Sequence, residues 1–289
     1  MAAPPPPDLS STVALVAGAS RGVGRGVARA LGAAGAAVYV TGRSIGRRGR
    51  DGAPGTIDQT AQEVSRAGGR GHPVQTDHTR VEDVRALMRR IELEAGRLDV
   101  LVNAVWGGNE LGIDARPFWE QPLAMWDATM RSGVWAALLT TRFAAPLLMR
   151  PPDRAGLVVT VSFEDEGRYT GHLGYDVAKA SLNRFAFAAA QDLRPHGVAS
   201  VALSPGFVRT ERVLEAFRVS ERRWTRVPEL AGSESPLYAG RAVAALAADR
   251  DVLAHTGRTL HVAALARAYG FTDVDGTQPE RFRLPGGAD

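Results

Sequence analysis

Short apolar runs alternate with longer segments in which apolar residues recur at helical spacing, from about residue 12 to the end of the chain. Runs of four to seven residues without polar alternation are typical of strands that are buried on both faces. The predicted strands are 12–17, 36–41, 71–76, 99–103, 157–162, 198–203 and 258–262, and the predicted helices lie near 24–34, 57–67, 81–95, 122–148, 175–193 and 236–248. Strands that alternate with helices pair in parallel through right-handed crossovers. The pattern therefore predicts one α/β domain with a doubly wound parallel sheet of about seven strands.

The same pattern divides the chain into three parts. Residues 1–10 contain a run of four prolines and neither a basic nor an apolar stretch, so we expect a disordered leader and not a signal peptide. Residues 11–262 form the predicted domain, and 263–289 form a C-terminal extension. Within the domain, 106–121 and 211–235 are longer than simple connections. Both follow strands, so they should lie at the carboxyl edge of the sheet, where ligands bind in such folds.

Composition narrows the function classes. The chain has no cysteine, which excludes disulfides and thiolate metal sites and fits a cytoplasmic location. The net charge of +4 comes from interspersed charges, and the six histidines lack metal-ligand spacing, so we expect no nucleic-acid partner and no metal. No apolar run approaches the roughly 20 residues of a membrane span. Lys179 is the only lysine among 35 lysine and arginine residues, which makes it a candidate for chemistry that arginine cannot perform.

A glycine-rich turn follows the first predicted strand and opens the first predicted helix. Glycines at this place allow a tight turn and let a phosphate group approach the backbone at a helix N-terminus. The spacing is G-x-x-x-G-x-G, and it predicts a Rossmann-type dinucleotide site. The candidate residues are Gly18, Ser20, Arg21, Gly22, Val23 and Gly24.

The end of the second predicted strand indicates which dinucleotide is bound. This position carries an acidic residue in many NAD-binding sheets, where it contacts the ribose 2′-hydroxyl. Here it carries Arg43, and Arg21 lies in the glycine-rich turn. Two guanidinium groups suit a 2′-phosphate. We therefore expect NADP(H) as the cofactor.

Tyr175 and Lys179 form the central catalytic candidate. A spacing of four residues on a helix places the phenol and the ammonium on one face, where the ammonium should lower the pKa of the phenol toward neutrality. Ser162 ends the fifth predicted strand, so its hydroxyl should lie at the same edge of the sheet. Together the three side chains predict proton exchange with a carbonyl or alcohol oxygen.

With the segment Ser204-Pro205-Gly206-Phe207-Val208-Arg209-Thr210, these motifs resemble the short-chain dehydrogenase/reductase family in order and spacing over nearly the whole chain. The long segment after the fourth strand and the extended tail resemble more narrowly its dehydrogenase/reductase member 1 branch. The resemblance implies that Ser162 orients a substrate carbonyl, that Tyr175 transfers the proton and that Lys179 holds the nicotinamide ribose. It also implies cofactor contacts for a further set of residues, namely Asp77, Asn103, Pro205, Gly206, Val208 and Thr210.

Two departures from the family's pattern concern the site. The family has Asn-Asn-Ala-Gly where this chain has Asn103-Ala104-Val105-Trp106, which places Trp106 near the cofactor or the pocket. The fourth residue of the family's catalytic tetrad is an asparagine, and the corresponding position is Gly133. These departures motivate the alternative of a non-catalytic NADP(H)-binding sensor or scaffold. A sugar-nucleotide epimerase also uses a Tyr/Lys pair, but the length and loop spacing disfavour it.

The main hypothesis is an NADP(H)-dependent oxidoreductase that interconverts a carbonyl and an alcohol. Aromatic and aliphatic residues in the two long segments favour a bulky apolar ketone, aldehyde or quinone of steroid or xenobiotic type as substrate. Arg209, Arg212 and Arg218 leave a carboxylate substrate open, since one of them could reach it. Those apolar residues are Trp106, Leu111, Ile113, Phe118, Trp119, Leu214, Phe217 and Trp224.

Apolar surface on the two long helices predicts a homodimer or homotetramer. It comprises Trp135, Leu138, Leu139, Phe143, Phe185, Phe187, Ala188 and Ala189.

Overall fold

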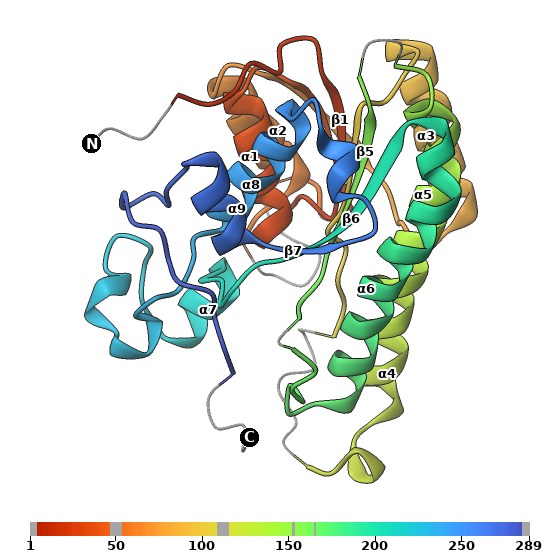
Figure 1. The fold of residues 1–289 in the computed structure, drawn as a ribbon. Coiled ribbons are helices and arrows are strands. Elements are labelled where there is room, and N and C mark those ends of the chain that lie inside the picture. Colours follow the sequence, from red (N-terminus) through yellow and green to blue (C-terminus); the bar gives the residue numbers. More distant parts are fainter. Residues whose placement is uncertain (1–4, 47–53, 109–115, 152–153, 165, 285–289) are drawn as a thin grey trace.

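A computed structural model describes residues 5–46, 54–108, 116–151, 154–164 and 166–284. Its centre is a parallel sheet of seven strands in the order β3-β2-β1-β4-β5-β6-β7 (Figure 1). The strands are β1 (Val13–Ala17), β2 (Ala37–Gly42), β3 (Arg70–Gln75), β4 (Val100–Asn103), β5 (Gly156–Val161), β6 (Val198–Ser204) and β7 (Thr259–His261). The expected doubly wound sheet of about seven strands is confirmed.

Helices cover both faces of the sheet. α1 (Gly22–Ala33), α2 (Ile57–Arg66), α8 (Pro236–Ala248) and α9 (Val262–Tyr269) lie on one face, and α3 (Val81–Ala95), α5 (Ala136–Leu148) and α6 (Leu173–Leu193) lie on the other (Figure 1). Each face has its own apolar core. β1 is an interior strand and pairs Val16 with Val40 of β2 and with Val102 of β4. These residues are fully buried, as continuous apolar strands require.

Close backbone contact joins α1 to α8. A Cβ atom at Gly26 would lie 2.0 Å from the carbonyl oxygen of Pro236, and one at Gly240 would lie 2.4 Å from the carbonyl oxygen of Gly26. Only glycine fits at either position. The packing fixes the N-terminal half of α1 against the body of the domain, and that half carries the glycine-rich turn.

The predicted helix 122–148 is three successive segments: α4 (Leu123–Thr129), a π-helical turn (Met130–Trp135) and α5. Single π-helical turns inside α-helices are frequent at functional sites, because they shift side chains and free backbone groups. Gly133 lies inside this turn and is buried.

Two helices were not predicted, and the end of the expected leader is packed on the domain. α7 (Glu211–Ala216) lies within the long segment 211–235, and α9 lies within the expected C-terminal extension. Leu9 is 1% exposed and its backbone N–H donates to Ala34 O, so the end of the leader packs on the domain and is not disordered. The remaining 3-10 segments are Phe118–Glu120, Arg194–His196, Trp224–Arg226, Pro228–Leu230 and Val252–His255.

Within the described ranges, no helix is both long and apolar enough to cross a membrane. The same residues contain no group of three or more histidine, aspartate or glutamate side chains arranged to hold a metal ion.

Candidate active site

A cavity of about 680 Å³ opens at the carboxyl edge of the sheet. Every predicted site residue except Asn103 lines it. The side chain of Asn103 is buried instead, and its amide donates to Thr141 Oγ1 of α5 at 2.9 Å. The contact with the adenosine ribose that the family resemblance implied for Asn103 therefore has no support from this geometry. A second groove of about 750 Å³ adjoins the cavity and shares Arg43, Ser44 and Asp77 with it.

The glycine-rich turn forms one wall of the cavity. Gly18 has φ +83°, and a Cβ there would lie 2.7 Å from the backbone of Ala104. A Cβ at Gly24 would lie 2.2 Å from Gly18 O. Since neither position has room for a side chain, no side chain at either glycine covers the backbone at the start of α1. This cradle fits a dinucleotide pyrophosphate.

Sequence reasoning missed the residue that contacts this cradle in the present structure. Glu211, the first residue of α7, accepts a hydrogen bond from Gly22 N at 2.7 Å through Oε2. Its Oε1 atom lies 3.3 Å from Arg25 Nη1. A carboxylate therefore sits at the N-terminus of α1, where an anion is stabilised by the helix dipole.

The adenosine end of the cavity carries the expected arginine and aspartate. Arg43 is exposed to solvent, and Arg21 contacts Ser44 Oγ at 3.4 Å. Asp77 accepts hydrogen bonds from Thr79 N at 3.0 Å and from Thr79 Oγ1 at 2.7 Å. Burial disfavours its charged form, but these bonds and the positive charge of Arg43 outweigh burial and lower the pKa of Asp77. A cation and an ionised carboxylate thus lie together at this end.

Ser162, Tyr175 and Lys179 meet at the centre of the cavity. Ser162 follows β5 and is buried, and its hydroxyl donates to the backbone carbonyl of Lys179 at 3.0 Å. His172 caps the N-terminus of α6 by accepting from Tyr175 N at 3.2 Å. This cap fixes the first turn of α6, which carries Tyr175. The sequence prediction that these three side chains share one cavity agrees with the geometry.

The electrostatics of the pair differ from the expectation. Burial, assisted by the charge of Asp176, raises the pKa of Tyr175 to about 12, and burial lowers the pKa of Lys179 to about 7. The predicted depression of the phenol pKa is therefore wrong for this ligand-free arrangement. The reason is geometric, because the ammonium lies 5.4 Å from the centre of the phenol ring and makes no hydrogen bond to its hydroxyl. Tyr175 is consequently a protonated acid at neutral pH.

Sequence analysis placed Trp106 near the cofactor or the pocket. In the structure, Trp106 lines the cavity beside Lys179 and Tyr175. The Lys179 ammonium sits 3.9 Å above the Trp106 ring, and the Tyr175 ring meets the same indole edge-on at 5.4 Å between ring centres. The other described aromatic and aliphatic residues expected in the pocket do not line the cavity. Phe118 and Trp119 are largely exposed, and Trp224 packs on Arg209. Leu111 and Ile113 lie outside the described residues.

Three phenylalanines form the apolar wall instead. Phe163 lies 6.5 Å from Tyr175 and 6.3 Å from Phe282, and Phe282 lies 6.0 Å from Phe207, all between ring centres. Phe163 directly follows Ser162 after β5 and Phe207 lies in the predicted cofactor segment, so both have local sequence signals. Phe282 belongs to the C-terminal extension. Nothing in the local sequence shows that it returns to the cavity.

Ion pairs hold the end of the extension over the cavity. Arg281 pairs with Glu166 at 2.9 Å and with Glu164 at 3.7 Å, and Arg283 pairs with Glu166 at 3.5 Å. Both carboxylates belong to the loop between β5 and α6. These ion pairs join the end of the tail to the loop after Ser162. They involve Arg281 and Arg283, the residues on either side of Phe282.

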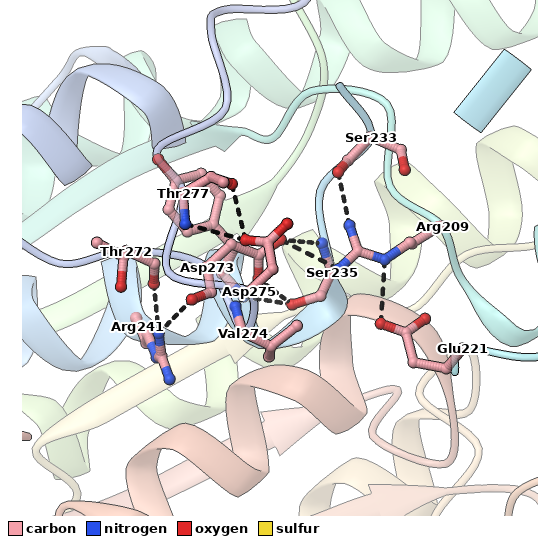
Figure 2. A network of polar contacts seen from close by, with 11 residues as sticks. Arg209, Glu221, Ser233, Ser235, Arg241, Thr272, Asp273, Val274, Asp275 and Thr277 are labelled. Atoms are coloured by element: carbon pink, nitrogen blue, oxygen red, sulfur yellow. Dashed lines mark hydrogen bonds and ion pairs between the residues drawn. The ribbon is translucent and has the colours of Figure 1, made fainter. Parts of the chain in front are cut away.

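Arg209 anchors the base of the same extension and cannot bind substrate. It is 1% exposed, donates to Ser233 O at 2.6 Å and to Glu221 at 3.0 Å, and pairs with Asp273 at 3.3 Å (Figure 2). Trp224 covers its guanidinium at 4.2 Å. Arg209 is almost fully buried, its Nε and Nη1 atoms donate to protein oxygens, and it does not line the cavity, so it is not the carboxylate-binding arginine that the sequence left open. Arg212 still lines the cavity.

Comparison with known proteins agrees with the site. Residues 12–219 match the short chain dehydrogenase family. The chain is 37% identical over 276 residues to mouse Dehydrogenase/reductase SDR family member 1, a match that covers 93% of this chain and 85% of the mouse protein. It is 36% identical to the human protein of that name, over 96% of this chain and 86% of the human one.

Solved structures show the same fold. The crystal structure of a short chain dehydrogenase from Mycobacterium thermoresistibile superposes with a TM-score of 0.77 at 23% identity and covers 95% of this chain and 97% of that one. The family binds a nicotinamide cofactor, for which the glycine cradle is suited. The chain belongs to the short-chain dehydrogenase/reductase family and is an oxidoreductase of that family.

Proposed function

We propose that this protein is an NADP(H)-dependent oxidoreductase that interconverts a carbonyl and an alcohol on a bulky apolar substrate. The observation that carries the proposal is the convergence of Ser162, Tyr175 and Lys179 on a cavity that also holds the glycine cradle. The cofactor supplies the hydride when it is bound. Arg43 and Arg21 would hold the 2′-phosphate, and Gly22, Val23 and Gly24 would offer backbone N–H groups to the pyrophosphate.

The protein's own residues perform the proton chemistry. In the reducing direction, Tyr175 donates its hydroxyl proton to the substrate oxygen, and its raised pKa keeps that proton available. Ser162 turns its hydroxyl from the Lys179 carbonyl toward the substrate oxygen and orients it. The Lys179 ammonium then favours the tyrosinate that remains.

The substrate class follows from the wall formed by Phe163, Phe207 and Phe282. These aromatic rings provide large apolar area next to Tyr175. A steroid-like or xenobiotic ketone would bury more surface there than a sugar or a short oxo-acid. Arg212 is the cavity residue that would favour a carboxylate.

Turnover measured as NADPH oxidation, with a panel of apolar and polar carbonyl compounds, tests the proposal. Tyr175→Phe should lower kcat by about a hundredfold or more, as loss of a general acid does, and should leave NADPH affinity unchanged. Tyr169→Phe is the matched control, because Tyr169 is 60% exposed on the adjacent loop. NADPH binding without turnover of any carbonyl would favour the sensor or scaffold alternative. A cytoplasmic location remains a prediction.

A further inference from the structure

The environment of the Lys179 ammonium contains aromatic faces and no acidic partner. Lys179 is 8% exposed, and among the residues the structure describes no carboxylate pairs with it and no oxygen accepts a hydrogen bond from Nζ. Its closest characterised contact is the Trp106 ring at 3.9 Å, and the Tyr175 ring follows at 5.4 Å. Burial removes part of the hydration of a cation, and this loss needs compensation. The indole face supplies it through a cation–π contact.

Gly133 explains why the indole can occupy this position. A Cβ atom at Gly133 would lie 2.9 Å from Trp106 Cζ3 and 3.2 Å from Cε3, so the ring fills the space that a side chain at Gly133 would need. The π-helical turn Met130–Trp135 brings the bare backbone of Gly133 to the ring. The indole of Trp106 therefore needs a glycine at position 133, and the glycine at that position is in turn explained by the indole.

The indole also contacts the acid of the proposed reaction. The Tyr175 ring meets it edge-on, with 5.4 Å between centres and 72° between planes. A single side chain from the segment after β4 thus touches both ionisable members of the site. Displacing the indole would remove a contact of Lys179 and a contact of Tyr175 at the same time.

We propose that Trp106 is a positioning residue that holds the Lys179 ammonium beside Tyr175 through its indole face, and that Gly133 is required because it leaves room for that indole. This inference rests on the proposed function for its catalytic consequence. Its structural part is independent of turnover. The aromatic rings that face the ammonium are those of Trp106 and Tyr175.

The composition of the chain provides a direct test, because Lys179 is its only lysine. Protein grown with ¹³C-labelled lysine gives one lysine Cε signal in an NMR spectrum. Protons above an indole face are shifted upfield by the ring current, so the Hε protons of Lys179 should lie upfield of those of free lysine. Trp106→Leu should return the signal toward the free value, and Trp106→Phe should retain part of the shift. Trp119→Phe, at a tryptophan that is 72% exposed and does not line the cavity, is the control and should change nothing.

A double-mutant cycle tests the role of Gly133. Gly133→Ala should displace the indole and reduce the upfield shift. In the Trp106→Leu background, the same substitution should have no further effect, because no indole remains to be displaced. Thermal unfolding and NADPH binding identify variants that have merely lost their fold.

Activity supplies the catalytic readout. Trp106→Leu should lower kcat by roughly tenfold or more, the loss that a desolvated cation–π contact represents, and Trp106→Phe should recover part of it. An unshifted lysine signal in the wild type, or one that Trp106→Leu leaves in place, would overturn the inference. A signal that responds as expected in a protein without carbonyl turnover would uphold the contact and reject the proposed function instead.

Discussion

Glu211 on α7 accepts a 2.7 Å hydrogen bond from the backbone N–H of Gly22, the first residue of α1. The carboxylate thus takes the position at a helix N-terminus that favours an anion. A pyrophosphate at the glycine cradle needs the same N–H groups. A pyrophosphate bound there, as proposed above, would have to displace the Glu211 carboxylate from Gly22 N.

We therefore expect Glu211→Gln to bind NADPH more tightly than the wild type, by about twofold to fivefold, since it removes a charge interaction at a helix terminus of about 0.3–1 kcal/mol. Calorimetric titration of the purified protein measures the change. Glu215→Gln on the same helix is the control, because Glu215 is exposed and lines no described cavity. Equal or weaker NADPH binding by Glu211→Gln would show that the contact does not compete with the cofactor.

Arg43→Ala should weaken NADPH binding roughly tenfold and leave NADH binding unchanged. The guanidinium makes a charge-assisted bond to the 2′-phosphate, which only NADPH carries, and its exposure places the loss at the low end of the 1.5–3 kcal/mol range. Dissociation constants for both cofactors test this expectation. Arg89→Ala, at an exposed arginine of α3 outside both grooves, should alter neither constant. A preserved preference for NADPH in Arg43→Ala would assign the 2′-phosphate to other residues.

The sequence predicted the residues whose positions depend on local structure. Gly18 and Gly24 follow a buried strand, and Ser162 and Tyr175 flank the loop after another, so the topology of a parallel sheet brings them to one edge. The prediction needed only the succession of strands along the chain and the helical period. Both can be read from the positions of apolar residues in the sequence.

The residues that the sequence did not predict depend on contacts between distant segments. Phe282 reaches the cavity because Arg281 pairs with Glu166, more than 100 residues away. Arg209 is buried because Asp273 and Glu221 come to it from two other segments. Neither pairing leaves a periodic signal. Loop aromatics such as Trp119 also cannot be assigned to a pocket by type alone, since they can equally face solvent.

His78 should make the stability of the fold sensitive to acid. Its ring lies between Thr41 Oγ1 at 2.8 Å and Thr140 Oγ1 at 2.9 Å, and burial lowers its pKa to about 4. The unfolded chain binds a proton near pH 6.5 and the folded chain does not, so the free energy of unfolding falls as the pH drops from 6.5 to 4, by up to about 3 kcal/mol.

Urea unfolding at several pH values measures this slope, which His78→Gln should lack between pH 6.5 and 4. His196→Gln, at an exposed histidine, should retain the wild-type slope. An identical slope in His78→Gln and the wild type would mean that His78 is not the titrating group.

The long helices should associate two copies of the chain. Trp135, Leu138 and Phe187 are 42%, 44% and 41% exposed on the adjacent segments α5 and α6 and the turn before α5. Leu139, which was expected on this surface, is buried. Leu138→Arg should therefore shift a dimer or tetramer to the 30.7 kDa monomer in sedimentation experiments without unfolding it. A wild-type monomer at micromolar concentration would contradict the expectation.

Phe282 should determine the preference for apolar substrates, because its ring bridges Phe163 and Phe207 across the wall of the cavity. Phe282→Ala removes aromatic contacts of about 0.5–1.5 kcal/mol each, so kcat/KM for a bulky apolar ketone should fall about tenfold while a small carbonyl compound is affected little. Arg281→Ala should produce a weaker form of the same change, since it releases the tail from Glu166 without altering the ring. Arg267→Ala is the control, because it breaks an exposed tail contact with Glu280 outside the cavity. If Phe282→Ala lowered kcat/KM equally for small and bulky substrates, the tail would support the fold of the site and would not select the substrate.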